Sequence, residues 1–254
     1  GMNFFLVLRK EMTEQWRTKR LLIVAAVLII FGLSSPLLAK VTPEILRSVP
    51  NLPAGLADII PDPSLTDAVA QYVKNMSQFG ILLAVLMSMG AVAQEKERGT
   101  AALMLTHPVG HASFLLAKFS ALALTFTLSL AIAMLGCWYY TLLLFEALPW
   151  GAYLALNGLM LVVFLVYIAV TLFCSTLART QGAAAGLSFA GLVLIAGLGS
   201  VPRLNEYFPG QLFNWGMSLV LGGEISAWAA FGVSLGMIIV SVSAAWLVFR
   251  RQEL

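Results

Sequence analysis

Charged residues are scarce in this sequence. Only 11% of its 254 residues are Asp, Glu, Lys or Arg, whereas a soluble domain carries about 25%. A chain with so few charges cannot cover a water-facing surface, and its 60% of hydrophobic residues suits a lipid bilayer instead. The formal net charge of +3 is also too small to indicate a nucleic-acid partner. The composition therefore predicts an integral membrane protein.

The sequence also lacks the motifs of several enzyme classes. It contains no G-x-x-x-x-G-K-[ST] phosphate loop, so ATP hydrolysis by that route is not expected, and no H-E-x-x-H zinc helix. Ser188 stands in the spacing G-x-S-x-x-G, which differs from the G-x-S-x-G of a serine nucleophile. The two cysteines, Cys137 and Cys174, both lie within apolar stretches, where packing is their ordinary role. We predict that the chain is not an enzyme and carries no catalytic, cofactor-binding or metal site.

Six apolar stretches are long enough to cross a bilayer, for which a helix needs about 20 residues. They cover residues 21–39, 76–93, 119–140, 152–177, 183–201 and 225–249, and none contains Asp, Glu, Lys or Arg. We expect an all-α protein with six transmembrane helices. Since ion-coupled transporters usually carry an ionisable residue inside the membrane, these uncharged spans suggest that any active transport draws its energy from a partner.

Lysine and arginine are distributed unequally between the two sides of this arrangement. With both termini in the cytoplasm, the inner segments hold 11 of the 15 basic residues and the outer segments hold 4. The inner residues are Arg9, Lys10, Arg17, Lys19, Arg20, Lys96, Arg98, Lys118, Arg179, Arg250 and Arg251, and the outer ones are Lys40, Arg47, Lys74 and Arg203. The positive-inside rule thus predicts a multi-pass protein of the cell membrane with both termini cytoplasmic.

Residues 1–20 precede the first span, and Gly1 is interpreted as the remnant of a cleaved tag. Phe5, Leu8, Met12 and Trp16 recur at helical spacing, so they share one face of a helix, with charged residues opposite. This pattern favours an amphipathic helix on the membrane surface, in contact with lipids, over an ordinary helical tail. The remaining residues, 21–254, are expected to form a single transmembrane domain.

Two longer segments are expected on the outer side. The loop 40–75 contains five of the ten prolines, and the apolar pairs between them suggest short helices at the membrane mouth. The segment 202–224 mixes aromatic and polar residues, which indicates a pair of interfacial or re-entrant helices.

The inner loop 94–118 has a more specific pattern. Charges alternate from Glu95 to Arg98, Gly99 permits a tight turn, and an amphipathic stretch follows that ends at Pro108. From these features alone, a short helix along the membrane and a solvated hairpin both remain open. His107 and His111 lie four residues apart, but two imidazoles with a proline between them make a poor metal site.

This loop resembles the hallmark of type 2 ABC transporter permeases. The matching residues are Glu95, Glu97, Gly99 and Thr100, then Leu103, Leu105 and the pair Pro108-Val109. The resemblance implies a second permease copy or paralogue and two separate ABC ATPase subunits, which would bind ATP and Mg²⁺. It also implies a connecting helix over 3–20, a short cytoplasmic coupling helix within 95–111, and a second ATPase contact at 178–181. The implied coupling residues are Glu95, Glu97, Arg98, Gly99, Thr100, Pro108 and Arg179.

The function expected from these features is that of the membrane subunit of an ATP-driven ABC exporter. A membrane-embedded enzyme or assembly factor without a transport cycle, and a secondary transporter, remain as alternatives. The uncharged spans favour a lipid-like, amphipathic or peptide cargo over a small hydrophilic ion.

Overall fold

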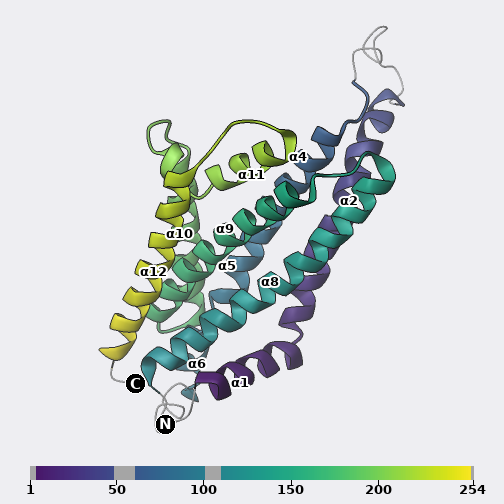
Figure 1. Ribbon diagram of the computed structural model, residues 1–254. Helices are drawn as coiled ribbons and strands as arrows, with labels where there is room; N and C mark the ends of the chain where they lie inside the picture. Colours follow the sequence, from purple (N-terminus) through teal and green to yellow (C-terminus); the bar gives the residue numbers. More distant parts are fainter. Residues whose placement is uncertain (1–3, 49–60, 101–109, 253–254) are drawn as a thin grey trace.

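The computed structural model describes residues 4–48, 61–100 and 110–252. Six helical stretches within these ranges are long and apolar enough to cross a membrane (Figure 1), as the sequence predicts. They are Arg20–Arg47 (α2), Leu65–Glu97, His111–Leu144 (α8), Trp150–Leu177 (α9), Gln181–Gly199 (α10) and Trp228–Arg250 (α12). No strand occurs in the described part of the chain. The protein is therefore an all-helical integral membrane protein.

The second of these stretches is not a uniform α-helix. It consists of α4 (Leu65–Asn75), a π-helical turn (Met76–Gly80), α5 (Ile81–Ser88) and, after a short turn, α6 (Ala93–Glu97). A capping box starts α4, because the Ser64 hydroxyl and the Asp67 carboxylate each accept a backbone N–H from the other residue.

Helix α9 lies at the centre of the bundle. It is the most buried of the six candidate spans, and α5, α8, α10, α11 (Gln211–Leu221) and α12 all pack on it. Helix α2 packs mainly on α8 and α4. Two buried hydrogen bonds join elements on the α4 side of the core: Tyr72 donates to Asn157 (2.6 Å), and Asn75 donates to Ser35 (2.9 Å).

Helix α1 (Phe4–Arg17) lies at the end of the bundle that also holds α6 and the last turns of α12 (Figure 1). Lys19 adopts a left-handed conformation with φ 59°, which turns the chain from α1 into α2. Phe5 and Trp16 are exposed, consistent with a lipid-facing side. The face buried against the bundle is a different one, formed by Val7, Glu11 and Gln15.

The loop predicted over 40–75 is shorter than expected. Helix α2 continues through Pro43 to Arg47, and α4 already begins at Leu65. The sequence predicts the end of the first helix at Ala39, where the apolar run ends, but α4 packs against α2 and supports further turns. Residues 49–60 lie outside the described residues.

The segment 202–224 holds one 3₁₀ turn (Asn205–Tyr207) and α11 rather than two full helices. Helix α11 packs on α9, where Gly216 lies directly against Leu156. Trp215 of α11 also contacts Trp228 at the start of α12, with ring centroids 4.8 Å apart.

Helices α2 and α8 approach each other closely at Gly32. A Cβ at this position would lie 2.7 Å from the backbone oxygen of Ala133. We expect Gly32→Val to lower the free energy of unfolding by about 1–3 kcal/mol, since two backbones must separate to admit the side chain. Gly236→Val, on α12 with open space around it, is the matched control. Unfolding in detergent micelles measures both, and equal effects would contradict the close crossing.

Candidate functional site

The motif of the loop, residues 95–100 in the described part of the chain, centres on α6, a helix of five residues that is held at both ends. The Ser175 hydroxyl of α9 accepts the backbone N–H groups of Val92 (3.1 Å) and Ala93 (3.0 Å), which caps the start of α6. Gly99 follows the helix at φ +70°, a conformation that suits glycine. The Thr100 hydroxyl donates to the Glu95 carbonyl (3.2 Å). The motif therefore forms a fixed turn.

Glu95 points inward, into an ion-pair network that joins three elements. The Lys118 ammonium of α8 lies 2.7 Å from Glu95 Oε1 and 3.1 and 3.2 Å from the two carboxylate oxygens of Glu11 on α1. The three side chains are only 4% (Lys118), 8% (Glu11) and 13% (Glu95) exposed. Because buried charges are stable only when paired, this network fixes α1, α6 and α8 relative to one another.

Further polar contacts extend this network along α1 and to the start of α2. Thr125 of α8 donates to Gln15 (2.5 Å), and Arg20 donates to Gln94 (3.0 Å). Lys10 lies 3.2 Å from Glu11 and 3.5 Å from Glu95. Burial alone lowers the pKa of Lys10, but the surrounding carboxylates outweigh this effect and raise it, so Lys10 stays charged at neutral pH.

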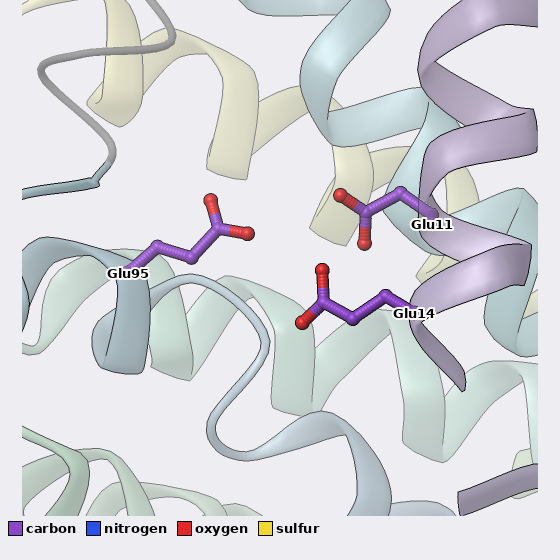
Figure 2. A group of neighbouring side chains, drawn as sticks. All are labelled: Glu11, Glu14 and Glu95. Carbon is purple, nitrogen blue, oxygen red and sulfur yellow. The ribbon is translucent and has the colours of Figure 1, made fainter. Parts of the chain in front are cut away.

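Glu11, Glu14 and Glu95 point toward one another, and their oxygens approach within 4.8 Å (Figure 2). A cavity of about 30 Å³ lies beside them, which is room for a water molecule. Three carboxylates at this spacing could hold a divalent cation. Since Lys118 already contacts two of the three carboxylates, the arrangement is explained as an ion-pair network without a metal.

Lys96 and Glu97 reach in another direction, to the junction between α9 and α10. The Lys96 ammonium donates to the carbonyls of Thr176 and, at 3.4 Å, Ala178, where α9 ends. The Glu97 carboxylate accepts the backbone N–H of Gln181 (2.9 Å), the first residue of α10. Each charge lies at the helix end whose dipole it complements. Lys96 and Glu97 thereby link α6 to α9 and α10, in addition to the links that Glu95 makes to α1 and α8.

The C-terminal end of α12 also contacts Lys96 and the end of α9. Lys96 lies over the ring of Phe249 at 5.9 Å, and Phe249 stacks on Phe114 of α8 with centroids 5.2 Å apart. The Gln252 amide donates to the Thr176 carbonyl (3.1 Å). Together, the residues Glu95–Glu97 contact or neighbour the ends of α1, α8, α9, α10 and α12.

The structure thus places the predicted coupling residues in two groups. Glu95 is largely buried in the ion-pair network, whereas the other described coupling residues are exposed: Glu97, Arg98, Gly99, Thr100 and Arg179. Two of these exposed residues also bond within the chain, Glu97 to the Gln181 N–H and Thr100 to the Glu95 carbonyl. The exposed residues of the two loops, 98–100 and 179, lie near each other, because the contact between Glu97 and Gln181 brings these loops side by side. Pro108 and most of the predicted coupling helix lie outside the described residues.

Lys118 and Glu11 were not predicted as site residues. Lys118 counted only as an inner basic residue, and Glu11 was assigned to no face of the first helix. One signal was available: Val7, Glu11 and Gln15 recur every four residues, a stripe that lies between the predicted apolar and charged faces.

Six apolar helices, with one polar motif at which the ends of five helices meet, define a multi-pass membrane protein. Comparison with known proteins specifies the class further: residues 5–254 match the ABC-2 family transporter proteins, and the chain belongs to this family. It is therefore a membrane permease component of an ABC transporter, a type of subunit that is not itself catalytic and associates with an ABC ATPase. The chain is also similar to the uncharacterized transmembrane protein YxlG of Bacillus subtilis (strain 168), with 27% identity over 251 residues and 97% of each chain covered.

Proposed function

We propose that this permease exports its cargo, driven by ATP hydrolysis on a separate subunit that acts through the loop 94–118. ATP and Mg²⁺ bind the ATPase, and two permeases, either two copies or a copy and a paralogue, pair with two ATPase subunits. Both termini, α1 and α6 then lie in the cytoplasm, as the distribution of basic residues favours. Family membership favours this function over an assembly factor or a secondary transporter.

One observation carries the proposal: a three-residue stretch binds elements far apart in the sequence. Glu95 holds α8 and α1 through Lys118, while Lys96 and Glu97 hold the ends of α9 and α10. A displacement of the exposed residues 98–100 is therefore transmitted to several spans at once, whereas a flexible loop would absorb it. Glu95 and Glu97 act in this scheme as positioning residues rather than as direct contacts of the ATPase.

Arg98 and Arg179 are the proposed contacts with the ATPase. Both are exposed, and they flank the hydrogen bond between Glu97 and Gln181. We expect the double variant Arg98→Glu, Arg179→Glu to reduce retention of the ATPase by about tenfold, because charge reversal sets like charges against the partner surface. Co-purification from native membranes in mild detergent, with quantitative mass spectrometry of the ATPase, measures this effect.

The matched control is Arg203→Glu, an exposed reversal in the loop that follows the far end of α10. It should retain the ATPase at the wild-type level. If no ATPase co-purifies with the wild-type chain, the function itself is contradicted. If the ATPase is retained equally by all variants, only the assigned contact is wrong.

A further inference from the structure

A groove outside the motif lies between the first turns of α8 and the last turns of α12. It has a volume of about 290 Å³ and is lined by Ala112, Leu115, Leu116, Val242, Ser243 and Trp246. Five of these six side chains are apolar. Leu116 in the groove and Leu247 beside it are 44% and 47% exposed, so the surface around the groove is also apolar. An apolar surface of this kind on membrane-spanning helices suits contact with lipid chains.

Positive charge lies at the end of this groove. The Arg250 guanidinium stacks over the Trp246 ring at 5.4 Å, and Arg250 is the last residue of α12. An arginine paired with a tryptophan at the end of an apolar helix is typical of the level of the lipid headgroups. The groove thus offers an apolar slot with a cation at the end where the helix leaves the membrane core.

We propose that this groove binds one anionic phospholipid, with an acyl chain along the slot and its phosphate on Arg250. The charge complementarity selects an anionic headgroup, since the slot itself cannot distinguish one lipid from another. The small side chains Ala112 and Ser243 lie among larger apolar ones between the two helices, which leaves a slot that a flexible acyl chain can fill. The proposal requires only that α8 and α12 span a membrane, and it is independent of the direction and energy source of transport.

The test uses a phosphatidylglycerol probe that carries a photoreactive group in its acyl chain. The purified full-length protein is labelled in phosphatidylcholine nanodiscs, and cross-linked peptides are mapped by mass spectrometry. We expect labels on residues 112–116 and 242–246, displaced by unlabelled phosphatidylglycerol but not by equal phosphatidylcholine. Arg250→Gln should weaken labelling about fivefold, as expected for the loss of one basic residue near an anionic headgroup.

Two further variants make the test specific. Arg251→Gln removes the same charge from the next residue, which neither lines the groove nor stacks on Trp246, and should label at the wild-type level. Ser243→Trp fills the slot and should abolish labelling there. Equal competition by phosphatidylcholine, or an equal loss in Arg250→Gln and Arg251→Gln, would overturn the proposal. Finding the groove covered by a second copy or by the ATPase, through protein–protein cross-links at 112–116, would overturn it as well.

Discussion

Replacing Lys118 by Met is expected to lower the free energy of unfolding by about 3–5 kcal/mol, the usual cost of removing one partner from a buried ion pair. The variant leaves Glu11 and Glu95 buried, with side chains that are 8% and 13% exposed, without the buried cation between them. Lys10 stays near both carboxylates, but at 3.2–3.5 Å and 42% exposed it compensates their charges less well. Methionine keeps the unbranched shape of lysine, so the loss reports the charge rather than a cavity. Denaturant or thermal unfolding in detergent micelles measures the effect.

Lys74→Met provides a matched control for this variant, because Lys74 is exposed on α4. It should change stability by less than about 0.5 kcal/mol. The triple variant Lys118→Met, Glu11→Gln, Glu95→Gln should recover much of the loss, since replacing all the charges removes the uncompensated ones. A Lys118→Met protein as stable as the control would show that the three charges do not form a buried network.

Glu97→Ala is expected to leave folding and insertion intact but to uncouple ATP hydrolysis from transport. The substitution removes the acceptor for the Gln181 N–H, which costs about 1 kcal/mol at a helix start. The same contact is the link between the motif and α10, so its loss should reduce coupling by about 0.5–2 kcal/mol. Gly99→Val should act in the same way, because φ +70° is strained for a β-branched residue and the turn after α6 must change.

The readout is the stimulation of the partner's ATPase activity when permease and ATPase are reconstituted together in liposomes. Glu97→Gln is the informative control, since its amide oxygen still accepts the Gln181 N–H and should restore most of the coupling. If Glu97→Ala and Gly99→Val both stimulated the ATPase as strongly as the wild-type permease does, the role assigned to the motif would be wrong.

The long apolar stretches made the six spans predictable from the sequence. The full lengths of the helices could not be predicted in the same way. Hydropathy finds the part of a helix that crosses the bilayer, and α2 and α8 continue beyond it to Arg47 and back to His111. The π-helical turn at Met76–Gly80 left no mark in the pattern of residues either. There, Gly80 admits the ring of Phe164, whose nearest atom would lie 2.3 Å from an added Cβ.

The motif was recognisable from its sequence, but the partners of its side chains were not. Lys118 and Glu11 are 107 residues apart in the chain, and their contact depends on how α1 folds back against α8. Local spacing cannot report such a contact. The resemblance implied coupling roles for the two glutamates of the motif, which stay predictions, but it gave no sign that both also make contacts within the chain.

The structure and the family together describe a permease whose spans are joined at one end. The energetic argument rests on the buried charges at that end, and the mechanical argument rests on the two helix ends bound by Lys96 and Glu97. What the ATPase is proposed to move is therefore this joined end, and the opposite end of the bundle is expected to open in response.

A distance measurement between spin labels at that opposite end tests this coupling most directly. Thr66→Cys in the first turn of α4 and Arg203→Cys after α10 place labels on two exposed positions, while the native Cys137 and Cys174 are buried. With the ATPase partner bound, trapping by ATP and vanadate should shift the distance between the labels in the wild-type background. The shift should be smaller in Glu97→Ala, in a smaller fraction of the molecules, although ATP is still hydrolysed. A shift of the same size in Glu97→Ala, or no shift in either protein, would contradict transmission through the motif.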